Sequence, residues 1–165
     1  MTQLETARKG KISAEMRRVA YIEGVDPEFI RRGISKGRIA IPKNRRHKLS
    51  SISGIGQGLK TKINANLGTS KGSSSIAKEL VKMDAAIDLG ADTIMDLSTG
   101  LKIKETRRAI MAGSRVPVGT VPIYEIVING LKKYGAIKDI TAEDMFEVLE
   151  SQARDGVDFF TIHAG

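Results

Sequence analysis

Four side chains that can bind a polar ligand or move a proton stand near the ends of predicted strands. They are an amide, a thioether, a phenol and an imidazole, in the order Asn66, Met95, Tyr124 and His163. Amide, phenol and imidazole groups exchange hydrogen bonds, and an imidazole also titrates near neutral pH. Singly, each residue has a structural explanation: Met95 as core, Tyr124 as a half-buried ring, His163 as a structural histidine. Jointly, they predict one polar site at a common rim.

The segment around Asn66 illustrates the pattern. In the sequence INANL, Ile63, Ala65 and Leu67 alternate with Asn64 and Asn66, so a strand places both amides on one face. An unpaired buried amide costs about 1 to 3 kcal/mol. This face therefore either closes an internal hydrogen-bond network or binds a polar ligand.

Strands and helices alternate after residue 60, and these elements must position the four side chains. Apolar periodicity and turn residues predict strands over residues 61–67, 92–97, 116–121 and 157–163, and helices over residues 76–87, 103–112, 124–131 and 141–153. Alternation of this kind favours parallel strands with right-handed crossovers. The carboxyl ends of such strands meet at one edge, where Asn66, Met95, Tyr124 and His163 are expected to converge.

The fold class is α/β, and two architectures fit it. Repeating βα units build either a (βα)8 barrel or a doubly wound sheet. A whole barrel takes about 250 residues, and only four units fit here. The chain is therefore expected to be a fragment, a half-barrel that needs a partner, or a small doubly wound domain.

A small basic α+β segment precedes these units. Residues 1–62 hold 15 Lys and Arg against 5 Asp and Glu, whereas residues 63–165 hold 12 against 14. The change indicates a boundary near the glycine-rich sequence SISGIGQGLK, interpreted as a linker, so we divide the chain into residues 1–57 and residues 58–165. Helices are predicted over residues 13–22 and from Asp26, and a short strand over residues 38–42. The basic loop after it is either an exposed turn or an anion site built on Arg45 and Arg46.

Composition excludes several classes of protein. Without cysteine, the chain forms no disulfide, thiolate zinc site or iron–sulfur cluster of its own. It has no apolar run long enough to span a membrane and no secretory signal, so we expect a cytoplasmic protein. Aromatic residues make up 4% of the chain, which offers no stacking platform for single-stranded nucleic acid.

Four ordered motifs closely resemble the phosphomethylpyrimidine synthase family of thiamin biosynthesis. They are residues 64–68 (NANLG), 91–100 (ADTIMDLSTG), 116–124 (VPVGTVPIY) and 160–165 (FTIHAG). An earlier stretch, residues 37–47 (GRIAIPKNRRH), is similar to a family motif in its Gly, Arg, Pro, Asn and His, although its basic residues depart from the pattern.

The resemblance implies a (βα)8 barrel, of which this chain is the first half. It implies radical S-adenosylmethionine chemistry that rearranges aminoimidazole ribonucleotide into hydroxymethylpyrimidine phosphate. Asn66, Met95, Tyr124 and His163 match the substrate-binding residues of the family. The family's [4Fe-4S] cluster and zinc are bound by cysteines and histidines later in the chain, so none of these cofactors has ligands here. We expect the N-terminal part of a longer homo-oligomeric enzyme, inactive by itself, with no nucleic-acid or membrane partner.

Three alternatives remain open. The basic loop, and Leu101–Lys102 where the family more usually has a lysine directly after the glycine, allow a paralogue such as hydroxybenzimidazole synthase, which acts on the same ribotide. A nucleic-acid-binding module would use the basic first segment. A non-catalytic half-barrel would associate with itself to cover its strand edges.

Overall fold

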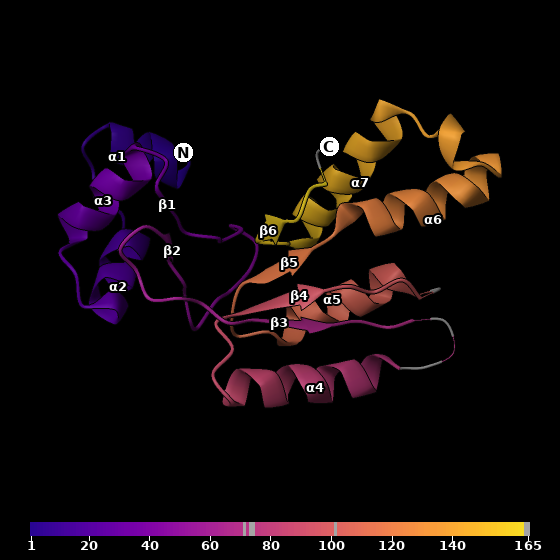
Figure 1. Ribbon diagram of the computed structural model, residues 1–165, viewed down its shortest axis with the longest axis horizontal. Coiled ribbons are helices and arrows are strands. Elements are labelled where there is room, and N and C mark those ends of the chain that lie inside the picture. The colour runs from indigo at the N-terminus through magenta and orange to yellow at the C-terminus, as the bar shows by residue number, and fades with distance from the viewer. Residues whose placement is uncertain (71, 73–74, 101, 164–165) are drawn as a thin grey trace.

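The computed structural model describes residues 1–70, 72, 75–100 and 102–163. Parts of the turn predicted between residues 70 and 75, together with Leu101 and the terminal residues 164–165, lie outside the described residues. Figure 1 shows three short helices at one end of an elongated molecule and a sheet with longer helices at the other.

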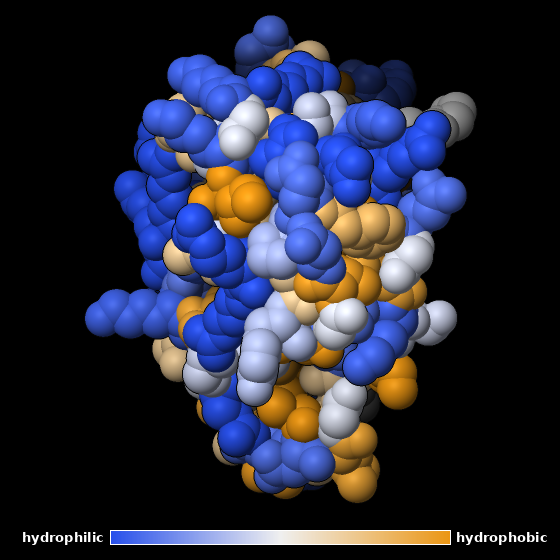
Figure 2. Space-filling model, turned by 90° about the vertical axis from the view of Figure 1, so that its left-hand side faces the viewer, coloured by the Kyte–Doolittle hydropathy of each residue, from blue (hydrophilic) through white to orange (hydrophobic). Residues whose placement is uncertain are grey.

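The N-terminal end is a small helical unit with its own hydrophobic cluster. Its elements are α1 (Gln3–Arg8), α2 (Ala14–Glu23), α3 (Pro27–Ser35) and two short antiparallel strands, β1 (Ile39–Ala40) and β2 (Ile55–Gly56). Met16, Val19 and Ile30 are among its fully buried side chains. The surface of this unit is largely hydrophilic, with a few apolar side chains between charged ones (Figure 2).

The helix boundaries follow from capping chemistry that is visible in the sequence. The Ser13 side chain accepts a hydrogen bond from the Met16 amide, and Asp26 accepts one from Glu28. Gly24 ends α2 in the left-handed conformation at φ 72°, which glycine adopts without steric cost. The helix predicted over residues 13–22 and the helix start at Asp26 are confirmed.

The larger unit alternates strands and helices, as predicted. It contains β3 (Asn64–Leu67), α4 (Ile76–Asp88), β4 (Thr93–Asp96), α5 (Ile103–Gly113), β5 (Val118–Thr120), α6 (Pro122–Tyr134), the 3-10 helix η1 (Ile137–Asp139), α7 (Ala142–Asp155) and β6 (Phe159–Phe160). The strands are parallel in the order β3-β4-β5-β6. The α/β fold class is confirmed.

The two faces of this sheet differ in chemistry. Ala65, Ile94 and Val118 are register neighbours on one face, where they belong to the cluster that α4 and α5 complete with Met83 and Ile110. The next register row, Asn66, Met95, Gly119 and Phe159, points to the opposite face. That face holds a hollow of about 420 Å³ between residues 55–62 and the strands.

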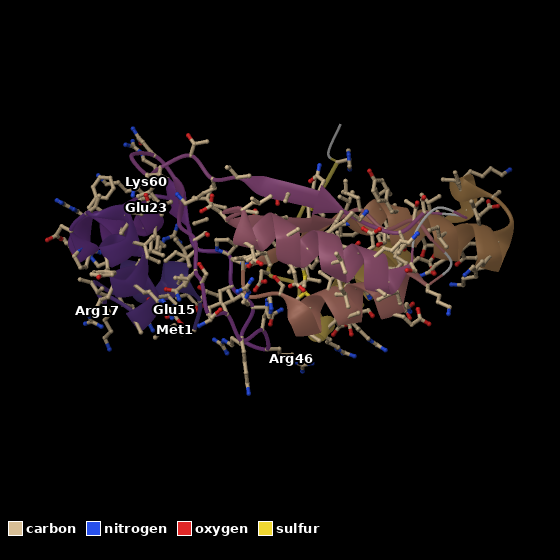
Figure 3. All side chains as sticks on the ribbon, turned by 90° about the horizontal axis from the view of Figure 1, so that it is seen from below. Met1, Glu15, Arg17, Glu23, Arg46 and Lys60 are labelled. Carbon is tan, nitrogen blue, oxygen red and sulfur yellow. The ribbon has the colours of Figure 1, made fainter. Side chains whose placement is uncertain are left out.

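The two units are connected through α2. The Glu23 carboxylate accepts a hydrogen bond from the Lys60 amide at 2.9 Å and pairs with the Lys62 ammonium group at 2.7 Å. Figure 3 shows Glu23 and Lys60 side by side at the junction. The Glu23 side chain is 2% exposed, so this pair is shielded from solvent.

Two predictions differ from the structure, and one helix was not predicted. The segment interpreted as a linker contains β2, because Ile55 and Gly56 pair with the distant residues Ala40 and Ile39. The last strand covers only Phe159–Phe160 instead of residues 157–163, because its described partner β5 ends at Thr120. Helix α1 was not predicted, since its six residues carry no apolar stripe.

Among the described residues, no helix has both the length and the apolar character needed to cross a membrane.

Candidate functional site

Asn66 and Met95 are neighbours on the sheet face that points away from the helices. They are register partners on β3 and β4, and side chains of such partners stand next to each other. Met95 is buried and Asn66 is exposed. The pair offers an accessible amide beside a polarizable apolar surface.

The two side-chain amides on β3, Asn64 and Asn66, differ in their hydrogen bonding. The Asn64 side-chain oxygen accepts a hydrogen bond from the Thr93 hydroxyl group at 2.8 Å, which closes an internal contact. The Asn66 side chain makes no hydrogen bond with any residue that the structure describes. Of the two explanations that the sequence left open, the network applies to Asn64, while Asn66 remains available to a ligand.

Tyr124 and His163 lie beyond the carboxyl ends of the two other strands. Tyr124 is half-buried in the first turn of α6, four residues after Thr120 ends β5. His163 is exposed, three residues after Phe160 ends β6. Thr120 and Phe160 are register partners, so the segments that lead to Tyr124 and His163 leave the sheet at the same edge.

The structure brings these residues together only in part. Asn66 and Met95 are adjacent, whereas Asn66 lies on one outer strand, β3, and His163 follows the other outer strand, β6. Three inter-strand spacings separate those strands, roughly 14 Å at the usual spacing. A ligand that touches all four side chains must therefore extend across the carboxyl edge of the sheet.

Hydrogen bonds join the loops that follow β3 and β4 at this edge. The Ser98 hydroxyl group donates to Asp96 Oδ1 at 2.5 Å and accepts from the Thr69 amide at 3.1 Å. The Gly68 amide donates to Glu79 Oε2 at 2.8 Å. A Cβ on Gly68 would lie 2.5 Å from the Ser98 nitrogen, so only glycine fits this close approach. The carboxyl edge near Asn66 is thus rigidly supported.

Asp96 is the titratable group beneath this edge with the clearest perturbation. Burial raises the pKa of Asp96 above its usual range, although hydrogen bonds from Ser98 and the positive charge of Arg107 oppose the shift. The negative charge of Glu79 also raises the pKa. Asp96 points to the helix side of the sheet and supports the loops from behind.

Sequence reasoning missed a second buried polar network, which lies behind Tyr124. Arg107 and Glu125 are 1% and 0% exposed, and Arg107 Nη1 donates to Glu125 Oε2 at 2.6 Å. A signal for both was present. Arg107 lies four residues after Ile103 and three before Ile110, and Glu125 lies three residues after the buried Pro122. Each charge therefore interrupts the apolar stripe of its helix.

Comparison with known proteins identifies the family. The model of the family described as "Radical SAM ThiC family" matches residues 2–165. The chain belongs to the Radical SAM ThiC family. It is similar to proteins named phosphomethylpyrimidine synthase, with 53% identity over 165 residues to one from Thermoanaerobacter sp. (strain X514) and 52% over 165 residues to one from Dehalococcoides mccartyi. A third, from Thermus thermophilus, is 49% identical over 166 residues.

These matches cover the whole of this chain but 38% of the length of each relative. The chain thus corresponds to less than half of a Radical SAM ThiC protein of that length. Radical S-adenosylmethionine proteins carry an iron–sulfur cluster, and such clusters are held by cysteine thiolates. This chain contains no cysteine, and its described residues form no group of three or more His, Cys, Asp or Glu suited to a metal ion. Its residues do not fit the role of cluster ligands.

Proposed function

We propose that this chain is part of a phosphomethylpyrimidine synthase, which converts aminoimidazole ribonucleotide to hydroxymethylpyrimidine phosphate in thiamin biosynthesis. The observation that carries the proposal is the identity of 49% to 53% with proteins of that name over the full chain. The relatives reported above all bear this name, so no observation favours the paralogous hydroxybenzimidazole synthase, a nucleic-acid-binding module or a non-catalytic half-barrel.

The proposed site consists of Asn66, Met95, Tyr124 and His163. Asn66, Tyr124 and His163 would bind the polar edges of the ribotide, because amide, phenol and imidazole groups both donate and accept hydrogen bonds. Met95 would pack against an apolar part of the ligand. His163 is exposed, so its imidazole would be accessible to the ligand.

The architecture that we propose is the first half of a (βα)8 barrel over residues 58–165, preceded by a basic segment over residues 1–57. The sheet supports this architecture, because helices pack on one of its faces and leave the other open. The strands of a barrel likewise carry helices on the outer face alone. The separate hydrophobic clusters of the two units support the division. We further propose a cytoplasmic homo-oligomer that binds a small molecule and no nucleic acid.

S-adenosylmethionine and a [4Fe-4S] cluster would supply the radical in the whole protein, and zinc is a further proposed cofactor. This chain lacks thiolate ligands, so residues outside it would bind these cofactors. This chain alone would therefore be inactive. The described residues would bind and orient the ribotide.

The test is ribotide binding to the full-length protein without its cluster. Asn66→Ala and His163→Ala should each raise the dissociation constant of aminoimidazole ribonucleotide by about tenfold, the loss of one hydrogen bond to a ligand. Asn64→Ala is the matched control, because Asn64 shares the strand and face of Asn66 but binds Thr93. Wild-type affinity in both Asn66→Ala and His163→Ala, with both variants folded by circular dichroism, would remove the site assignment.

A further inference from the structure

A chain of buried hydrogen bonds connects the end of β5 to the first turn of α6. The Thr120 hydroxyl group donates to Gln152 Oε1 at 2.6 Å, and Gln152 Nε2 donates to Glu125 Oε2 at 2.8 Å. Thr120, Glu125 and Gln152 are all at most 4% exposed. Thr120 and Glu125 stand on either side of residues 121–124, so the chain of bonds spans the segment that ends in Tyr124.

Arg107 anchors this chain from α5. It donates from Nη1 to Glu125 Oε2 at 2.6 Å and from Nη2 to Asp155 Oδ2 at 2.7 Å. Asp155 in turn accepts from Arg108 at 3.0 Å. Helices α5, α6 and α7 and strand β5 thereby meet in one network, and Figure 1 shows β5 running into α6 with α7 alongside.

The first turn of α6 has little local support of its own. Its N-cap residue, Val121, makes no side-chain capping bond, and the Tyr124 amide donates to the Val121 carbonyl oxygen at 3.1 Å. Glu125 bonds to Arg107 on α5 and to Gln152 on α7, so it ties this turn to both helices. Tyr124 is the residue directly before Glu125, so the same contacts fix its main chain.

Stability alone does not account for the network. Buried ion pairs are often no more stabilising than apolar side chains of similar volume, because the charges lose their hydration. One carboxylate oxygen, Glu125 Oε1, is buried without a hydrogen bond in the described part of the chain, and the Lys104 ammonium group lies 3.7 Å from it. Such an arrangement is costly, and its benefit is expected at a site where geometry matters.

We propose that Arg107, Glu125 and Gln152 are positioning residues that hold Tyr124 in the geometry needed to bind the ribotide. The inference rests on the proposed function, in which Tyr124 contacts the ligand. The three residues face the helix side of the sheet and act through the turn that carries the phenol.

A double-mutant cycle in the full-length protein tests this coupling. Tyr124→Phe and Glu125→Gln are made singly and together, and the dissociation constant of aminoimidazole ribonucleotide is measured for each. Gln keeps an oxygen acceptor for Arg107 and removes the charge. We expect Tyr124→Phe to weaken binding about tenfold, and Glu125→Gln to weaken it about tenfold with Tyr124 present and less than about twofold with Phe present.

Glu147→Gln is the matched control. Glu147 is exposed on α7, and its side chain makes no hydrogen bond with the described residues. It should leave the affinity unchanged in both backgrounds. If Glu125→Gln fails to fold, Thr120→Val replaces it in the same cycle, because valine matches the shape of threonine and removes only the bond to Gln152.

The outcomes separate the two proposals. Equal weakening by Glu125→Gln in both backgrounds, or none in either, would overturn the positioning role while leaving Tyr124 as a ligand contact. Wild-type affinity in Tyr124→Phe would contradict the assignment of Tyr124 in the proposed function, and the positioning role would fall with it. Weakening that disappears in the Phe background supports both.

Discussion

At the scale of single residues, polar side chains of the same type have different roles at the carboxyl edge of the sheet. Asn64 and Asn66 share a strand and a face, yet one binds Thr93 and the other is free of described partners. Alternation predicted their common face. Alternation does not predict which of the two asparagines has an internal partner, because that partner, Thr93, lies 29 positions along the chain from Asn64.

Asp96 gives a prediction about pH. Burial raises its pKa, so the folded protein binds this proton more readily than the unfolded chain, whose aspartate pKa is about 3.9. The free energy of unfolding therefore falls, through this group, as pH rises from about 4 through the raised pKa. Asp96→Asn keeps an oxygen acceptor for Ser98 and removes the charge. Relative to wild type, the variant should gain thermal stability as pH rises from about 4 to about 7.

The control for Asp96→Asn is Asp88→Asn on α4, whose side chain is 67% exposed and pairs with Arg115. Its effect should be within about 0.5 kcal/mol at either pH, because an exposed ion pair contributes little. Thermal midpoints of the full-length variants at the two pH values are the measurement. If the thermal midpoints of Asp96→Asn and wild type differ by the same amount at both pH values, the pKa of Asp96 is not the cause and the prediction is wrong.

At the scale of elements, the loop over residues 43–48 fastens the N-terminal unit to the sheet. Asn44 donates from its main-chain nitrogen to Asp158 Oδ1 at 2.7 Å and from its side chain to the Ala153 and Val157 carbonyl oxygens. His47 Nδ1 lies 2.6 Å from Asp158 Oδ2, and both side chains are at most 4% exposed. This contact precedes β6, the strand that leads to His163.

The sequence predicted that this loop is either an exposed turn or an anion site. In the structure, it instead connects the N-terminal unit to the sheet. The Arg45 and Arg46 side chains donate to the carbonyl oxygens of Met1 and Arg154, and Figure 3 shows Arg46 at the lower edge of the molecule in that view. Asn44 and His47, the Asn and His of the family-like stretch, make the buried contacts. Their partners lie more than 100 positions away, beyond the reach of local patterns.

Removal of the Asn44 amide should therefore destabilise the protein. Asn44→Ala loses three hydrogen bonds, because Asn44 Oδ1 also accepts from the Arg46 amide, and it leaves two carbonyl oxygens without this donor. The expected cost is about 2 kcal/mol in the free energy of unfolding. Arg45→Ala is the matched control in the same loop, since Arg45 is exposed and, among the described residues, its side chain donates only to Met1. Denaturant titration of the full-length variants measures both. Equal midpoints for Asn44→Ala and wild type would show that the loop does not fasten the units.

Capping and apolar stripes predicted most helices well, because these signals are local. Ser13, Asp26 and Thr141 each cap the helix whose start they predicted. Strand lengths were predicted less well, since a strand requires a partner. The predicted strand over residues 157–163 shortens to Phe159–Phe160, where pairing with β5 ends.

At the scale of the whole molecule, the family and the α/β class predicted from the sequence are confirmed, whereas the convergence of the four site residues stays a prediction. The motifs named the residues, and parallel pairing placed their strand ends on one edge. Three strand spacings nonetheless separate β3, which holds Asn66, from β6, which His163 follows. The distance that a ligand must span depends on the curvature of the sheet, which is a property of packing and not of any one motif.

The measurement that decides the account is a crystal structure of the full-length protein with bound aminoimidazole ribonucleotide. We predict that the Asn66 amide, the Tyr124 phenol and the His163 imidazole each lie within about 3.2 Å of a polar atom of the ribotide, with Met95 against its apolar part. A ribotide bound elsewhere, with Asn66 and His163 both free of it, would contradict the assignment of this edge as the substrate site.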